Sequence, residues 1–252
     1  MPHVTHENSA ESRPSFWESY RQGHHRTALL ILAGTFLLLT LAWAAVYVVD
    51  VYGLSQVGAL KGAWWHLFRQ GSPVEWIQWG FLALIFWHGS YLCGVYHQQG
   101  KETYARFWGW ASASFVLMLI EDAGDPRHVL ADYGSVLLGI PEKFIEGAVF
   151  AVMVAPLLWA LLRYRQPLKD NPQILPYAVV GTILYGLVAI STLLRVTENL
   201  YFRVGRSLSE SLTGGAVPPY FLVDFVIQET VEALAAAFLF AALLVYMRTA
   251  RS

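Results

Sequence analysis

The composition of the 252-residue chain points to the membrane: 56% of its residues are hydrophobic, 14% are charged, and the formal net charge is only −1. These values exclude a disordered chain and a water-soluble enzyme, and the near-neutral charge gives no reason to expect a nucleic-acid partner. The single cysteine, Cys93, excludes an intrachain disulfide and a cysteine-based metal cage. We therefore expect an integral membrane protein whose main partner is the lipid bilayer.

Apolar stretches long enough to cross a bilayer recur along the chain. We predict six spans, at about 27–52, 74–96, 104–125, 143–164, 174–200 and 220–247. The first is too long for a signal-peptide core, so we expect it to stay in the mature protein. The predicted fold is all-α, a polytopic six-transmembrane-helix bundle over 27–247, with an interfacial N-terminal segment (1–26) and a short tail (248–252).

The distribution of basic residues predicts which way the bundle faces. An even number of spans places both termini on one side, and ten bases fall on that side. They are Arg13, Arg21, Arg26, Lys101, Arg106, Arg163, Arg165, Lys169, Arg248 and Arg251. The opposite connections carry fewer bases, so we expect both termini to be cytoplasmic. The expected location is the cell membrane, as in the cytoplasmic membrane of a prokaryote.

Acidic residues concentrate in the opposite, outer halves of the predicted spans. Eleven of the eighteen acids lie there: Asp50, Glu75, Glu121, Asp122, Asp125, Glu142, Glu146, Glu198, Asp224, Glu229 and Glu232. A charge at the bilayer centre costs from about 2.5 to over 10 kcal/mol, so acids within spans normally face protein, water, a cation or a partner. Several of these side chains are therefore expected inside the bundle.

Helical spacing groups these acids on common faces. The groups are Glu121 with Asp125, Glu142 with Glu146, and Asp224 with Gln228 and Glu232. At about 1.5 Å per residue, Glu232 lies roughly 18 Å along its span, close to the midplane. We select five residues as a candidate metal or proton site: Glu121, Asp125, Glu146, Glu229 and Glu232.

Few bases are near enough to neutralise the acids. Arg127 and His128 follow the Glu121–Asp125 run, and Arg195 stands three residues before Glu198. The predicted supporting ion network is Asp122, Arg127, His128, Glu142, Arg195 and Glu198. The remaining negative charge must be relieved by shared protons or by a cation.

The carboxylates suit a divalent metal ion more than a redox cofactor. Oxygen ligands favour Ca²⁺, Mg²⁺ or Mn²⁺, and adding His128 would favour Zn²⁺, Mn²⁺ or iron. The chain contains no Glu-x-x-His motif, which disfavours a di-iron site of the helical-bundle type. It also contains no His-Glu-x-x-His motif, which a zinc metalloprotease would need. We do not expect haem, because His88 within the second predicted span has no opposing histidine at similar depth.

Three functions remain open from the sequence, and whether the protein is an enzyme is open with them. The first is a divalent-cation-binding protein that acts on a lipid or small molecule at the outer leaflet. The second is a proton- or cation-coupled transporter with Glu229 and Glu232 as its relay. The third is an accessory subunit of a membrane complex, or a homo-oligomer, whose ion network is structural.

Overall fold

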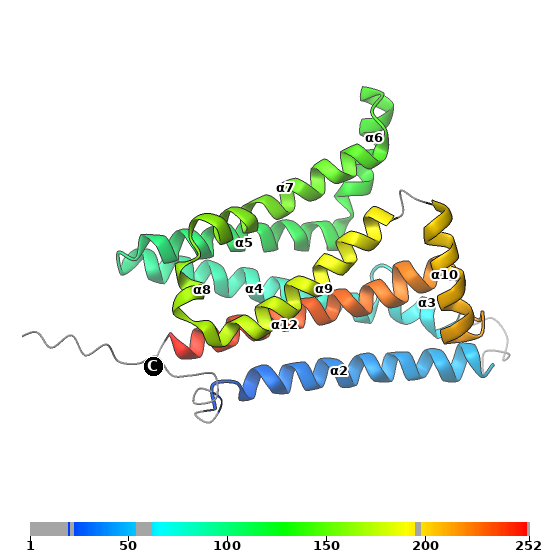
Figure 1. Cartoon of the computed structure of the whole chain (residues 1–252), viewed down its shortest axis with the longest axis horizontal. Helices are drawn as coiled ribbons and strands as arrows, with labels where there is room; N and C mark the ends of the chain where they lie inside the picture. Colours follow the sequence, from blue (N-terminus) through cyan, green and yellow to red (C-terminus); the bar gives the residue numbers. More distant parts are fainter. Residues whose placement is uncertain (1–19, 21–22, 54–61, 195–197, 251–252) are drawn as a thin grey trace, which may run out of the picture.

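The structure of the protein is a computed structural model. It describes residues 20, 23–53, 62–194 and 198–250, with the backbone alone at 192–194 and 198–199. All regular elements within these ranges are helical, as the composition predicts, and the long helices run side by side in one bundle (Figure 1). The fold class is therefore an all-α helical bundle.

Helices of 20 or more residues build the bundle. They are α2 (Arg26–Val46), α4 (Pro73–Gln98), α5 (Glu102–Gly124), α7 (Glu142–Arg163), α9 (Leu175–Leu194) and α12 (Gln228–Thr249). Shorter elements connect or extend them: α3 (Ala63–Phe68), α6 (Pro126–Leu138), α8 (Gln166–Asp170), the 3-10 turn Pro172–Ile174, α10 (Glu198–Thr213), α11 (Pro219–Phe221), and the π-helical segments Tyr47–Val51 and Leu222–Ile227.

Part of the described chain is apolar enough to cross a membrane by length and composition. Four stretches qualify: Arg26–Val51, Glu142–Arg163, Pro172–Ser191 and Pro219–Thr249. Helices α4 and α5 are of similar length but do not qualify, and they carry polar residues such as Gln78 of α4 and Asp122 of α5. The four stretches support a membrane protein.

The fifth predicted stretch differs most from the helix that forms there. Helix α9 ends at Leu194, whereas the prediction continued to residue 200. Residues 198–200 instead begin α10, a strongly amphipathic helix that contacts α11 and the π-helical turns at the same end of the bundle. The hydrophobic pattern changes from apolar all round to one-sided after Leu194, which is typical of a helix that leaves the bundle core.

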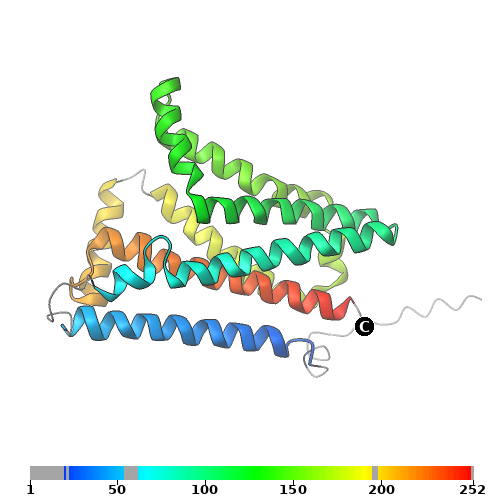
Figure 2. The same cartoon turned by 180° about the vertical axis from the view of Figure 1, so that it is seen from behind.

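Helix α12 is the centre of the bundle. It packs against α2, α4 and α9; α5 then packs on α4, and α7 packs on α5. Seen from behind, α4 and α5 lie side by side along their length (Figure 2). The buried face of α12 is rich in alanine, including Ala235, Ala236 and Ala241, each with 0% exposure. Small side chains let helix backbones approach closely, so α12 can take three neighbours at once.

One end of the bundle is tied together by polar contacts of α2, α9 and α12. The buried His25, which precedes α2, shares a 3.0 Å hydrogen bond with the Tyr177 hydroxyl of α9. Arg248 near the end of α12 donates to the Gly23 carbonyl at 3.1 Å and to the Thr27 hydroxyl. The beginning of α2 and the end of α12 therefore lie next to each other.

The closest approach of α9 to α12 predicts the effect of a minimal substitution. A Cβ added at Gly181 would lie 2.8 Å from Leu239 Cγ and 3.0 Å from the Ala235 carbonyl oxygen. We expect Gly181→Ala to lower the free energy of unfolding by about 1–3 kcal/mol because the backbone must shift. SDS-titration unfolding of the purified protein measures it. Gly186→Ala on the same helix is the control, since its Cβ meets nothing within 4 Å; an equal loss in both variants would contradict the packing argument.

The contact of His25 with Tyr177 predicts a pH-dependent stability. Burial lowers the pKa of His25 because it disfavours the charged imidazolium, and the neighbouring His24 acts in the same direction. The unfolded chain therefore binds more protons than the folded protein just below the ordinary pKa of about 6.5, so stability falls as the pH falls through that range. We expect the thermal midpoint to decline between pH 7.5 and 5.5 (about the range of histidine titration), with a smaller slope in His25→Gln. Identical slopes in both proteins would refute this assignment.

Candidate functional site

The connection between α5 and α6 is a sharp corner at Asp125. This residue has a left-handed backbone, with φ 50°, and it is the only non-glycine residue with positive φ in the part of the chain that the structure describes. Aspartate tolerates this conformation better than most residues do. Pro126 then occupies the first turn of α6, where its missing N–H costs nothing. The corner brings Glu121 of α5 next to the first residues of α6.

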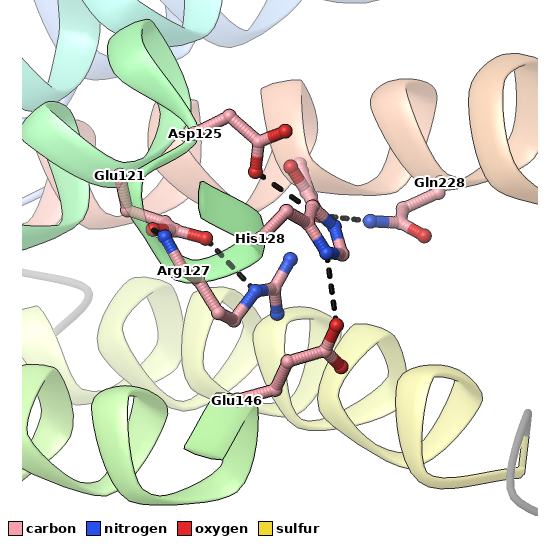
Figure 3. A network of polar contacts seen from close by, with 7 residues as sticks. Glu121, Asp125, Arg127, His128, Glu146 and Gln228 are labelled. Atoms are coloured by element: carbon pink, nitrogen blue, oxygen red, sulfur yellow. Dashed lines mark hydrogen bonds and ion pairs between the residues drawn. The ribbon is translucent and has the colours of Figure 1, made fainter. Parts of the chain in front are cut away.

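Five side chains form an outer ion network at this corner: Glu121, Asp125, Arg127, His128 and Glu146 (Figure 3). Its best-enclosed contact joins Glu121 Oε1 to Arg127 Nε at 2.9 Å, with the side chains 9% and 18% exposed. Glu121 Oε2 also accepts the Arg127 backbone N–H at 3.1 Å. One carboxylate therefore holds both the side chain and the backbone of Arg127.

His128 connects the corner to α7. Its Nδ1 lies 2.9 Å from Glu146 Oε1, and its Nε2 lies 3.7 Å from Asp125 Oδ1. A protonated imidazole would donate from both ring nitrogens and would pair with both carboxylates. The network thus links α5, α6 and α7 through alternating acids and bases.

A second group of polar side chains lies between α4, α5 and α12, and we call it the glutamine-centred cluster: Gln78, Asp122, Gln228 and Glu232. Gln78 is 1% exposed, and its side-chain amide donates to Asp122 Oδ2 at 2.6 Å and to Glu232 Oε2 at 3.0 Å. Gln228 donates to Glu232 Oε1 at 2.9 Å. Two partly buried carboxylates are therefore held by one neutral amide.

Three further buried groups adjoin this cluster. Glu75 and Glu229 are 5% and 9% exposed, and both lie close enough to Glu232 for their charges to repel. Glu75 accepts the Gly71 backbone N–H. The Tyr185 hydroxyl of α9 is buried near Asp122 and Glu232 and has no hydrogen-bond partner of good geometry. Glu229 Oε2 and Gln78 Oε1 are also buried atoms without a hydrogen-bond partner of good geometry.

The charge balance differs between the two groups. In the outer ion network, Arg127 and His128 face three carboxylates. In contrast, Glu75, Asp122 and Glu229 form no ion pair with any base whose position the structure describes. Buried carboxylates in this situation repel one another strongly, because the surroundings screen their charges poorly.

The five residues selected from the sequence divide between these two groups. Glu121, Asp125 and Glu146 belong to the outer ion network, whereas Glu229 and Glu232 lie in or beside the glutamine-centred cluster. The proposed supporting residues divide as well. Asp122 contacts Gln78 rather than a base, and Glu142 is exposed on the first turn of α7. The side chains of Arg195 and Glu198 lie outside the described residues.

Sequence reasoning missed the residues that organise the cluster. Gln78 has a detectable signal, since it follows Glu75 by three residues on an otherwise apolar span and therefore shares its face. Tyr185 has none, because it stands in an apolar stretch where tyrosine is common.

Other acids from the outer halves have structural roles. Asp50 accepts the backbone N–H groups of Ala63 and Trp64, both at 3.0 Å, and so caps the start of α3. Asp224 in the π-helical segment accepts a hydrogen bond from the Tyr201 hydroxyl of α10. These acids hold the connections in place and need no ligand to explain them.

The geometry offers little for a metal ion. Within the described ranges, no group of three or more His, Cys, Asp or Glu side chains is arranged to hold one. The reason is visible in the contacts, because amide, guanidinium and imidazole groups already occupy carboxylate oxygens of Asp122, Glu121 and Glu146. Comparisons with protein-family models, curated proteins and solved structures find no match to the chain.

The Glu121–Arg127 pair predicts a strong and recoverable loss of stability. Arg127→Met leaves an enclosed carboxylate without its partner, and we expect a cost of about 2–4 kcal/mol in the free energy of unfolding. The double variant Glu121→Gln/Arg127→Met is expected to recover at least half of this loss. SDS-titration unfolding of both variants measures the coupling.

The exposed pair Glu102–Arg106, 3.8 Å apart with side chains 52% and 59% exposed, provides a matched control. Removing Arg106 is expected to cost less than about 1 kcal/mol. Equal costs at the two sites would show that burial does not strengthen the dependence of Glu121 on Arg127.

Proposed function

We propose that the chain is a multi-pass membrane protein that binds and exchanges protons at the glutamine-centred cluster. One observation carries this proposal: the buried Gln78 amide donates to both Asp122 and Glu232. A shared donor keeps the two carboxyl groups close together. Their electrostatic repulsion is relieved when one of them holds a proton, as in other carboxyl pairs.

The surrounding groups provide acceptors and donors for such a proton. Gln78 Oε1 is a buried acceptor without a partner, so it can receive the O–H of a protonated carboxyl group. Glu229 Oε2 is equally buried and unpaired, and a proton there would remove one of the repelling charges. The Tyr185 hydroxyl can donate to one carboxylate or accept from another.

A divalent cation is the alternative means of relieving this negative charge. Its support is the surplus of carboxylates, since Glu75, Asp122 and Glu229 pair with no described base. Against it, the arrangement of ligands within the described ranges is unsuited to a metal ion. The Gln78 amide would have to turn its N–H groups away from the carboxylates before they could coordinate a cation.

The other functions inferred from the sequence receive less support. Transport across the whole bundle needs polar groups along the opposite half, where α4, α5 and α12 pack through aromatic residues such as Tyr96, Trp108 and Tyr246. We propose that the outer ion network, by contrast, is structural and fastens α6 to α5 and α7. A subunit that only stabilises a complex would need this network but not the buried cluster.

We also propose that all six long helices cross the cell membrane, with both termini cytoplasmic. Helices α4 and α5 pack lengthwise against each other, and α4 also packs on α12, the helix within the most buried apolar stretch. Several of their polar residues, including Gln78, Ser112 and Ser114, are buried in this interior, which accounts for part of a composition less apolar than that of their neighbours. The excess of bases on the side of the bundle that carries both termini supports a cytoplasmic position for that side.

Infrared difference spectroscopy tests proton binding directly. The detergent-solubilised protein is titrated while the absorption of protonated carboxyl groups is followed. We expect this absorption at neutral pH, where ordinary carboxyl groups are ionised. Asp122→Asn and Glu229→Gln should each reduce it, because each removes a carboxyl group from the cluster.

The exposed Glu142→Gln is the control and should leave the signal at neutral pH unchanged. Elemental analysis of the same samples separates the alternatives. A stoichiometric divalent metal in the parent protein, lost in Asp122→Asn, would favour the cation over the proton. A parent protein without protonated carboxyl groups at neutral pH would refute the proposal.

A further inference from the structure

A cavity of about 290 Å³ lies between α5, α7, α9 and α12. Helix α7 packs on α5, and α9 packs on α12. The cavity occupies the space between the α5–α7 pair and the α9–α12 pair. Helices α7 and α9 belong to stretches that are apolar enough to cross a membrane. Two of the helices that line the cavity therefore have the composition of membrane spans.

The walls of the cavity are mostly apolar. Residues from α5 and α7, including Met118, Met153 and Leu157, face Gly186 of α9 and Leu239 of α12. A Cβ added at Gly186 would meet nothing within 4 Å, so the backbone of α9 borders open space at this point. Methionine and leucine side chains adapt to flexible chains, and walls of this kind suit an alkyl or isoprenoid segment.

One end of the cavity is polar. Asp122 and Glu232 of the glutamine-centred cluster reach it, together with the Tyr185 hydroxyl and the Glu121–Arg127 ion pair. Carboxyl oxygens outnumber positive charges there, and the one arginine already pairs with Glu121. The polar end thus offers acceptors, whereas an anionic group would meet repelling carboxylates. Tyr185 adds a buried hydroxyl without a hydrogen-bond partner of good geometry.

We infer that this cavity binds a membrane-soluble amphiphile with one apolar chain and a head group that donates hydrogen bonds, a hydroxyl or an ammonium. Its head contacts Asp122, Glu232 and Tyr185, and its chain lies between α7 and α9. At about 30 Å³ per water-sized group, the volume accommodates roughly ten non-hydrogen atoms. Recognition of the head group rests on the proposed function, because it depends on the protonation of Asp122 and Glu232. Binding of the apolar chain by the cavity walls does not depend on the proposed function.

Ten-carbon probes match this volume. The purified full-length protein in lipid nanodiscs is labelled with a diazirine derivative of decanol, and the modified peptides are identified by mass spectrometry. We expect labels on residues 150–161 and 182–189, the lining segments of α7 and α9. Decanol or decylamine should compete at least tenfold better than decanoate. The stronger of these two competitors identifies the head group as hydroxyl or ammonium.

Two glycine variants show whether the label reports the cavity. Gly186→Leu fills it and should reduce labelling at least tenfold. Gly34→Leu makes the same change on α2, where a Cβ also meets nothing within 4 Å, and should have no effect. Unchanged labelling in Gly186→Leu, or decanoate competing as well as decanol, would overturn the inference.

The infrared experiment keeps this result separate from proton binding. Gly186→Leu retains all carboxyl groups of the cluster, so its protonated-carboxyl absorption should match that of the parent. Loss of labelling with this absorption intact supports the binding site. Cavity labelling in a parent without protonated carboxyl groups would refute proton binding alone.

Discussion

The hydrogen bonds that the Gln78 amide donates to Asp122 and Glu232 join α4, α5 and α12 at their most polar point. A carboxylate inside an apolar bundle is tolerated only if nearby groups satisfy it. Gln78 satisfies two at once but supplies no charge, so the helices are connected while the negative charge is left to be balanced. The same hydrogen bonds that join the three helices therefore hold the two carboxyl groups whose negative charge is left unbalanced.

In the outer ion network, carboxylates are stabilised by bases rather than by a neutral amide. At the α5–α6 corner, Arg127 brings a positive charge to Glu121, and the His128 ring lies between Asp125 and Glu146. Paired charges are expensive to separate, and they hold a corner in a fixed geometry. Asp122, the residue next to Glu121 at the end of α5, belongs to the glutamine-centred cluster, so the corner and the cluster are adjacent. The outer ion network thus lies beside the glutamine-centred cluster, and its Glu121–Arg127 pair also borders the cavity.

The packing of α12 determines where space remains in the bundle. Its alanine-rich face draws α2, α4 and α9 close, whereas α7 is anchored mainly to α5 and α6. Helices α7 and α9 are consequently held by different partners, and the cavity lies between them. Asp122 and Glu232 of the glutamine-centred cluster contribute to its polar end, so one set of carboxyl groups can serve both proton binding and recognition of a head group.

The sequence alone determined the class of the protein and the position of most long helices, because long apolar stretches and their polar interruptions are local properties. It also identified Glu121, Asp125, Glu146, Glu229 and Glu232 as unusual, since acids are costly in spans. Only the tertiary structure decided which of them meet. Contacts such as Gln78–Glu232 join residues 154 positions apart, and helical spacing describes faces of single helices rather than the partners that those faces find. The division into a corner that contains Arg127 and His128 and a cluster whose acids pair with no described base, and the cavity beside it, arises from helix packing.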